Sequence, residues 1–519
     1  MKKKILMNLS FSVWPMLGYE LDFIQQKLNE GHIIKILYCN GSPTFCSANN
    51  SKILNYKKLK LVCRYCKSKF NNGLEWLSNK ENLIVENFNL ITSNQNKKLI
   101  EYKKLIKNKK TVDDKTLNFL KQINKEIENI CRTTLITETN ESFTNYNSKK
   151  NFNLFKKISI ACLESYFSSL NHLEKFKPDE IYIYNGRIYR YQPMLLLSKS
   201  KIKNENIFTY EFPVNSYENF MISKKNYFHD LKNLSHQYLE FNEKNKINFS
   251  KKKLIAEKWI NDKVIGDEYK NSYFPWKNNI KKNKISQDFD DTKFNITYFT
   301  STETEFIGIP ENEKEFGFAG NFEIIENIIK IIENSEAILN VKMHPQVNRD
   351  SKILFKQLVD LQKKFSNLKI IEPNSDIDTY KLIEKTDLII VMNSTVGIES
   401  AYFKKNVICL ANSSYMSFGA VKNVNNFQDL KTILNRCIYD KNFSDFPSDE
   451  NKTIGSINFI YALINFNFKS KFLIKKNYKH SIMFKNNKMY KLDGNLSNKL
   501  VFIIYSILRF FMKKLNIYI

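Results

Sequence analysis

Ser394 and Thr395 are the first candidates for chemistry, because they follow an apolar run, 388–392, that is typical of a buried strand. The triplet Asn393-Ser394-Thr395 favours the start of a helix, where hydroxyls and unbonded backbone N–H groups face an anion. Glu399 lies four residues beyond Thr395 on the same helical side, where its carboxylate could accept hydrogen bonds from a ribose. We therefore predict a phosphate site here. An ordinary helix cap beside a solvated glutamate is the alternative.

The segment 341–345 supplies a second candidate. An apolar strand delivers Lys342 and His344 to its carboxyl end, and Pro345 stops it. The carboxyl ends of parallel strands meet at one edge of a sheet, so both side chains are expected at the edge that holds Ser394. A structural histidine is the alternative.

Hydroxyl and acidic groups also follow the strand expected at 295–300. Ser301, Thr302 and Glu303 form a polar loop directly after it. We expect this loop at the same sheet edge, where it either lines a donor pocket or caps the next helix.

Short strands and amphipathic helices must position these groups. With helices between them, strands are expected at 295–300, 337–343, 368–371, 388–392 and 407–410. This alternation indicates an α/β fold with a doubly wound parallel sheet.

A strand, a helix and a strand at 4–39 indicate a second domain of the same kind, so we expect two Rossmann-like domains facing a cleft. The domain ranges that we predict are 1–285 with a helical insertion at about 78–150, 286–460, and a helical tail at 461–519. Within the tail, the segment 499–514 is apolar with flanking cations. It could lie in a membrane interface or dock on the protein.

Four thiols near the N-terminus could form a tetrahedral zinc site. Cys63 and Cys66 are separated by two residues, and Cys39 and Cys46 supply the other pair. Ordinary thiols, or a redox or cluster role, are the alternatives.

The 519 residues carry 81 Lys and Arg against 53 Asp and Glu, a formal net charge of +28. Only seven of the cations are Arg, the side chain best suited to bidentate phosphate and base contacts. This favours a lysine-rich surface with no nucleic acid partner, although a Lys-rich nucleic-acid-binding protein stays as an alternative. The 42% of hydrophobic residues exclude a disordered chain, and the low cysteine content indicates the cytoplasm.

The order His344-Pro345, then Asn393 to Ala401, then Tyr415 resembles the C-terminal domain of bacterial capsule polysaccharide and related surface-carbohydrate glycosyltransferases of the GT-B type. Tyr184 to Arg187 and the later Glu211 are similar to the first domain of that group. The resemblance covers roughly residues 1–75 and 155–425. The Ser-Thr and His-Pro patterns recur in sialyl-, Kdo- and polyol-phosphate transferases.

By resemblance, His344, Ser394 and Thr395 contact the donor phosphate, and Glu399 contacts the ribose or a nearby donor group. Lys342 stands where many relatives carry Arg. Ser301, Thr302 and Glu303 are the remaining donor-site candidates.

A base for the acceptor hydroxyl is expected from the first domain, where Glu211 and Glu20 are the candidates. Asn185 and Arg187 either orient an acceptor or support their loop. The resemblance implies no catalytic metal and no cofactor beyond a nucleotide sugar.

The function that the resemblance implies is sugar transfer from a nucleotide-activated donor to a capsule polysaccharide or lipopolysaccharide-type glycolipid. We expect it at the cytoplasmic face of the inner membrane, with peripheral membrane contact. The hexosyl, sialyl or Kdo type stays open. A CDP-polyol phosphotransferase of the teichoic-acid type is the alternative enzyme.

Overall fold

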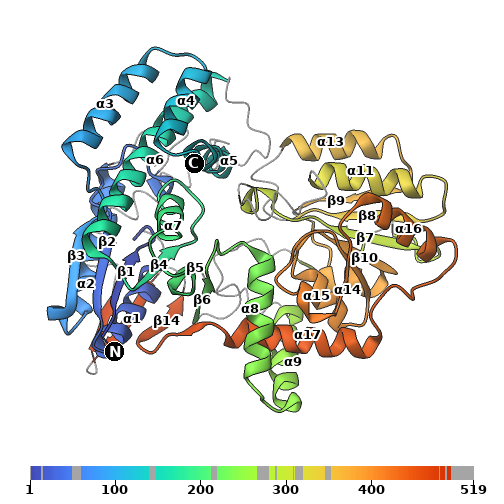
Figure 1. Cartoon of the computed structure of the whole chain (residues 1–519). Coiled ribbons are helices and arrows are strands. Elements are labelled where there is room, and N and C mark those ends of the chain that lie inside the picture. The colour runs from blue at the N-terminus through green and yellow to red at the C-terminus, as the bar shows by residue number, and fades with distance from the viewer. Residues whose placement is uncertain are drawn as a thin grey trace. The chain divides into compact units, whose positions relative to one another are not determined.

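The computed structural model falls into two compact units (Figure 1). Unit 1 holds the described residues of 1–228 and of 467–491, and unit 2 those of 229–466. The residues that the structure describes are 2–12, 16–49, 60–139, 148–211, 219–265, 280–286, 289–307, 309, 320–344, 352–373, 375–477, 480–485 and 488–491.

Unit 1 contains a seven-stranded sheet in the order β13-β6-β5-β4-β1-β2-β3. The five strands from β5 to β3 run parallel, and β6 and β13 extend the sheet in antiparallel fashion. The strands are β1 (Lys4–Asn8), β2 (Ile33–Tyr38), β3 (Leu83–Asn87), β4 (Glu180–Tyr184), β5 (Ile207–Glu211), β6 (Asn219–Lys224) and β13 (Phe468–Lys469). Chain order reverses direction between β1 and β4, which makes their carboxyl ends the topological switch point, where open α/β sheets bind ligands.

Helices and a small antiparallel sheet complete unit 1. The small sheet has the order β14-β15-β16, with β14 (Leu473–Asn477), β15 (His480–Lys485) and β16 (Lys488–Lys491). The helices are α1 (Met16–Asn29), α2 (Lys60–Trp76), α3 (Ser93–Lys107), α4 (Asp114–Ile123), α5 (Ile127–Thr139), α6 (Lys149–Phe176) and α7 (Gln192–Ser198).

Unit 2 contains a six-stranded parallel sheet in the order β12-β11-β10-β7-β8-β9. The strands are β7 (Asn295–Phe299), β8 (Ile338–Lys342), β9 (Leu368–Ile371), β10 (Leu388–Val391), β11 (Asn406–Cys409) and β12 (Lys422–Asn423). Here the order reverses between β7 and β10, so the loops after these two strands flank the switch point of unit 2.

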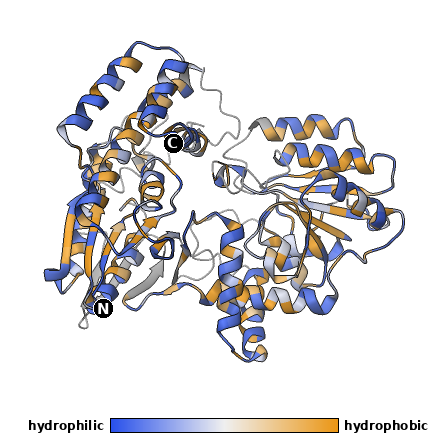
Figure 2. Cartoon of the chain, viewed as in Figure 1, coloured by the Kyte–Doolittle hydropathy of each residue, from blue (hydrophilic) through white to orange (hydrophobic). Residues whose placement is uncertain are grey.

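The helices of unit 2 follow its strands or flank the sheet. They are α8 (Leu231–Lys244), α9 (Phe249–Ile265), α11 (Asn321–Ile332), α13 (Lys352–Gln362), α14 (Thr379–Lys385), α15 (Val396–Tyr402), α16 (Phe427–Ile438) and α17 (Asp449–Asn465). In Figure 2 the strands of this sheet are mostly apolar, whereas α11 and α13 carry both apolar and polar residues.

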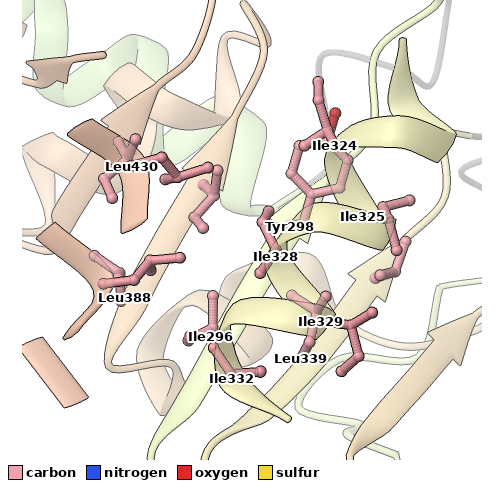
Figure 3. Close-up of a cluster of buried hydrophobic side chains, with 14 of the residues drawn as sticks. Ile296, Tyr298, Ile324, Ile325, Ile328, Ile329, Ile332, Leu339, Leu388 and Leu430 are labelled. Atoms are coloured by element: carbon pink, nitrogen blue, oxygen red, sulfur yellow. The ribbon is translucent and has the colours of Figure 1, made fainter. Parts of the chain in front are cut away.

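The core of unit 2 follows from the two-residue period of its strands. Ile296 and Tyr298 of β7, Leu339 of β8 and Leu388 of β10 lie on one face of the sheet and are fully buried. They pack against a row of isoleucines on α11 (Figure 3). This packing holds β7, β8 and β10 together. It therefore also fixes the loops that follow these strands at the carboxyl edge of the sheet.

The expected doubly wound α/β organisation is confirmed in both units. The boundary expected after residue 285 is wrong, because α8 and α9 belong to unit 2. The cause is an aromatic contact that spans the sequence: Tyr238 of α8 meets Phe459 of α17 and Phe466, with ring centroids 5.9 and 5.2 Å apart. Helix α17 also contacts α9.

Two further expectations need correction. The segment at 78–150 is not wholly helical, because the β-branched and apolar run Leu83–Asn87 forms edge strand β3. The described residues beyond Asn465 form strands, since Asp22 of α1 accepts hydrogen bonds from the backbone N of Lys471 and Phe472 and holds them in unit 1. The interfacial segment 499–514 lies outside the described residues. Among the described helices, none is long and apolar enough to cross a membrane.

Candidate active site

Three loops meet at the carboxyl edge of the unit 2 sheet. Phe299, the last residue of β7, pairs in register with both Lys342 of β8 and Val391 of β10. The loops that begin at residues 300, 343 and 392 therefore leave the sheet side by side. Two strand spacings separate the outer loops, about 10 Å. The predicted groups on these three loops thus share one edge.

The loop after β7 holds His344 in place. The Thr300 hydroxyl accepts a hydrogen bond from the backbone N of His344 at 2.8 Å, and the Thr302 hydroxyl lies 3.4 Å from Nδ1 of the imidazole. Thr302 and His344 are both half-buried. The structure thus brings together two of the predicted donor-site residues.

Glu303 and Ser301 support this loop. The Glu303 carboxylate accepts a hydrogen bond from the backbone N of Asn321, at the start of α11. The Asn321 amide in turn bonds the backbone of Ser301, accepting at 3.3 Å and donating at 2.9 Å. Ser301 is only 5% exposed. Glu303 therefore caps the start of α11, which was one of the two alternatives. Ser301 stabilises the loop through the hydrogen bonds of its backbone.

Ser394 and Thr395 follow β10 on the other side of β7. The Ser394 hydroxyl accepts weakly from the Val396 backbone N at 3.4 Å, whereas the Thr395 side chain makes no capping bond. Both residues are half-buried. Helix α15 has only seven residues, so its dipole is short.

A close backbone approach fixes the Ser394 turn. The Tyr415 hydroxyl donates to the Ser394 carbonyl at 2.6 Å. A Cβ at Gly397 would lie 2.6 Å from that hydroxyl and 2.9 Å from the Val391 side chain, so only glycine fits there. The sequence pattern contained Gly397 and Tyr415 without showing this positioning role.

Glu399 does not take the place that the sequence indicated. It is 3% exposed, and its two oxygens accept from Lys263 Nζ at 2.5 Å and from the Tyr380 hydroxyl at 2.8 Å. These contacts join α15 to α9 and α14. The structure therefore gives Glu399 a positioning role in place of the expected ribose contact.

Lys342 is a buried cation at the same edge. Its Nζ lies 3.5 Å from the Glu372 carbonyl oxygen, on the β9 side. Burial lowers the pKa of Lys342 to about 8, and the nearby Asp376 opposes this shift. Close to neutral pH this lysine can thus gain or lose its charge.

The carboxyl edge of the unit 1 sheet holds the other predicted residues. Glu211 accepts hydrogen bonds from the Tyr184 hydroxyl at 2.7 Å and from the Asn185 side chain. Asn185 adopts a left-handed φ of 54°, as expected for an Asn-Gly turn. The hydrogen bond between Asn185 and Glu211 therefore fixes the orientation of both side chains. Arg187 is 7% exposed.

Glu20 lies on α1 with no exposed surface. One oxygen accepts from the Ser10 backbone N at 2.6 Å and from the Tyr210 hydroxyl at 2.7 Å. The other has no hydrogen-bond partner among the described residues. Burial raises the pKa of Glu20, and these hydrogen bonds and the charge of Arg190 partly oppose the shift. Glu20 is thus a buried carboxyl group with a raised pKa and one oxygen that has no hydrogen-bond partner among the described residues.

The four N-terminal thiols give no support to a zinc site. Within the described ranges, no group of three or more His, Cys, Asp or Glu side chains is placed to hold a metal ion.

Comparison with known families supports the motif-based resemblance. Residues 315–444 match the profile of the family described as capsule polysaccharide biosynthesis proteins. This segment includes Lys342, His344, Ser394, Thr395 and Tyr415. The match confirms the resemblance to capsule biosynthesis proteins that these motifs indicated. A search of curated proteins found no match.

Several solved structures are distantly similar to the chain. KpsC of Thermosulfurimonas dismutans, titled a beta Kdo 2,4 transferase, is 11% identical, with a TM-score of 0.33, and covers 63% of this chain and 87% of its own. MnaA of S. aureus, titled a co-structure with UDP, is 12% identical, with a TM-score of 0.27 and coverages of 88% and 94%. A glycosyltransferase from Rickettsia africae is 12% identical, with a TM-score of 0.29 and coverages of 90% and 94%.

Proposed function

We propose that this protein is a glycosyltransferase that moves a sugar from a nucleotide-activated donor to a surface polysaccharide or glycolipid acceptor. One observation carries the proposal. His344, Thr302, Ser394 and Thr395 are half-buried on three neighbouring loops at the switch point of unit 2, and His344, Ser394 and Thr395 lie inside the segment that matches the capsule family.

The unit 2 site suits the departure of a nucleotide. When the bond from sugar to phosphate breaks, negative charge gathers on a phosphate oxygen. The hydroxyls of Thr302, Ser394 and Thr395 and the imidazole of His344 can donate hydrogen bonds to that oxygen. Protonated Lys342, at the same edge, adds a positive charge. Hydrogen bonds hold the backbone of His344 and of Ser394 before the ligand arrives, which lowers the reorganisation that these two residues need.

The acceptor hydroxyl must lose a proton as it attacks, and we assign that step to Glu20. Its second oxygen is open, whereas both oxygens of Glu211 already accept hydrogen bonds. Because its pKa is raised, the ionised Glu20 carboxylate is a stronger base than that of an ordinary glutamate. Glu211 then serves as a support for Asn185 and Tyr184.

The proposal also includes where the protein acts. The capsule family match and the net charge of +28 support action beside an anionic membrane, at its cytoplasmic face. A lysine-rich nucleic-acid-binding protein would instead show salt-sensitive binding to DNA or RNA that nucleotides do not affect.

A thermal-shift titration of the full chain tests the donor site. UDP-, CMP-, GDP- and CDP-linked donors are compared with their free nucleotides, and one class should raise Tm. At 100 times its Kd, a ligand stabilises the fold by about 2.7 kcal/mol. His344→Ala and the double variant Ser394→Ala/Thr395→Ala should each lose most of this response.

Thr432→Ala provides the matched control, because this hydroxyl lies exposed on α16 and bonds only the Gln428 carbonyl. It should respond like the parent. The donor site is wrong if no nucleotide class raises Tm, or if the His344 and Ser394 variants respond as the parent does. Selective stabilisation by a CDP-linked polyol would favour the polyol-phosphate transferase.

A further inference from the structure

The switch point of unit 1 concentrates buried polar groups that the donor site does not use. Asn8 ends β1, Ser10 follows it, and Arg190 lies between β4 and α7. The carboxyl ends of β1 and β4 are neighbours, because Asn8 pairs with Ile183 in register. Both connecting segments therefore meet where a doubly wound sheet places a ligand.

Arg190 is the unusual member of this group. It is 2% exposed, and its Nε and Nη1 atoms have no hydrogen-bond partner in the described part of the chain. Its guanidinium lies over the rings of Phe11, Phe88 and Tyr191, at 4.8, 5.6 and 5.5 Å from their centroids. Aromatic faces attract a cation but do not satisfy its N–H groups. Buried charges in proteins are normally paired and hydrogen-bonded.

Glu20 does not serve as that partner. Its Oε1 atom is occupied by the Ser10 backbone N and the Tyr210 hydroxyl, and its Oε2 atom accepts no hydrogen bond from any described residue. The carboxylate is near enough for the charge of Arg190 to influence its pKa, yet no ion pair joins the two side chains. The Nε and Nη1 groups of Arg190 can therefore donate hydrogen bonds to a ligand.

Further polar atoms on the ends of β1 and β4 and the segments that follow them are also unsatisfied. Among the described residues, Asn8 Oδ1, Ser10 Oγ, the Tyr191 hydroxyl and Gln192 Oε1 lack a hydrogen-bond partner, and all four residues are at most 2% exposed. Native proteins leave few buried polar atoms unsatisfied. Such a concentration at one sheet edge indicates a place that a polar ligand completes.

We propose that Arg190 binds an anionic group, a carboxylate or a phosphate, and that the hydroxyls of Ser10 and Tyr191 bind polar atoms beside it. A neutral sugar would satisfy the hydroxyls but leave the buried cation uncompensated. The planar guanidinium can give two parallel hydrogen bonds to a carboxylate or phosphate. The identification of this ligand as the acceptor rests on the proposed function, and it makes the acceptor an acidic or phosphorylated glycan.

Anion binding to the full chain tests the proposal. The probes are sodium D-glucuronate for a carboxylate and inorganic phosphate for a phosphate, with D-glucose and matched sodium chloride as controls. Calorimetric titrations are made in the Ser394→Ala/Thr395→Ala background, which should weaken binding at the proposed donor site. At least one anionic probe should bind saturably, and D-glucose and chloride should not.

Arg190→Met should weaken that binding at least tenfold with only a small change in Tm, because Nε and Nη1 have no hydrogen bond to lose among the described residues and the apolar Met side chain can still pack against the three rings. Lys35→Met is the matched control, since Lys35 is likewise a buried cation of unit 1 (3% exposed) but is paired with Glu86 at 2.8 Å. It should lower Tm and leave probe binding unchanged. Tyr191→Phe removes a single unpartnered hydroxyl, and should weaken binding several-fold even if Arg190→Met fails to fold.

The outcomes separate the two proposals. If neither anion binds, or if the Arg190 and Tyr191 variants bind as the parent does, the anion site is wrong. Anion binding that depends on Arg190, in a chain that no nucleotide stabilises, would reject the donor site alone. Preference for D-glucuronate indicates an acidic sugar as the natural ligand, and preference for phosphate indicates a phosphorylated one.

Discussion

The two sheets of this protein share a strand order around their switch points but fill those points differently. In unit 2 the groups after β7, β8 and β10 are half-buried hydroxyls and an imidazole, held by backbone contacts. In unit 1 the groups around β1 and β4 are fully buried and include Arg190 and Glu20 with open hydrogen-bonding atoms. The shared topology thus places both sets of polar groups at the same point of their sheets, and the two sets differ in burial and charge and therefore suit different ligands.

The largest expected effect is a loss of stability when the buried ion pair between Lys263 and Glu399 is broken. Lys263→Met leaves the Glu399 carboxylate buried without its cation, and should lower the free energy of unfolding by about 3–5 kcal/mol. Urea unfolding measures this. Lys258→Met is the control on the same helix, because its ion pair with Asp262 is exposed and should contribute under about 1 kcal/mol. If Lys263→Met left stability unchanged, Glu399 would not be the positioning residue described above.

A second prediction concerns the charge at the unit 2 edge. Lys342 has a folded pKa of about 8, against an ordinary value of 10.5. Between these values the unfolded chain binds more protons, so the stability of the parent should rise with pH across this window. Lys342→Met removes the buried charge and should stabilise the protein by up to about 3 kcal/mol at pH 7. The two proteins should converge above pH 10.5.

The same variant sharpens the donor proposal. Only protonated Lys342 attracts a phosphate, so the donor response of the parent should weaken as pH rises through about 8. Lys342→Met should show a weaker response at pH 7 and no such change with pH. Equal pH dependence in both proteins would place Lys342 outside the donor site.

A third prediction tests the close approach at Gly397. Gly397→Ala places a Cβ 2.6 Å from the Tyr415 hydroxyl, and should destabilise unit 2 by about 1–3 kcal/mol while displacing Ser394 and reducing donor binding. Adding Tyr415→Phe removes the clashing oxygen and should restore part of the loss. Thermal melts with and without nucleotide measure both effects, and no recovery would assign the strain to Val391 instead.

The smallest expected effect lies in unit 1. The Tyr210 hydroxyl stabilises the charged form of Glu20, so Tyr210→Phe should raise the pKa of that base and move the acid limb of the pH–rate profile to higher pH. The cost in stability is expected near 1 kcal/mol. Tyr238→Phe, whose buried hydroxyl has no partner among described residues, should leave the profile unchanged. An unshifted profile for Tyr210→Phe would argue against Glu20 as the base.

Local patterns were sufficient to predict much of the fold and the sheet edge at which four candidate residues of unit 2 lie. Apolar runs of four to six residues identified the strands of unit 2, and polar residues directly after them located Thr302, His344, Ser394 and Thr395 at one edge. This worked because the carboxyl ends of parallel strands must coincide, whatever the rest of the chain does.

Long-range pairing decided what the patterns could not. The sequence indicates that Glu399 contacts a ligand, whereas in the structure Glu399 binds Lys263, which lies 136 residues earlier. The domain boundary moved because α8 and α9 pack on α17 far downstream. Arg190 is inconspicuous between two tyrosines, and only its burial without a partner makes it a candidate site.

By itself, the sequence determined the order of strands and helices and the edge at which the donor groups gather, since both follow from local periodicity. The tertiary structure alone decided which charges are paired and which are left open. A charge pair is a matter of distance in space, and residues that meet in the folded chain leave no common signature along it.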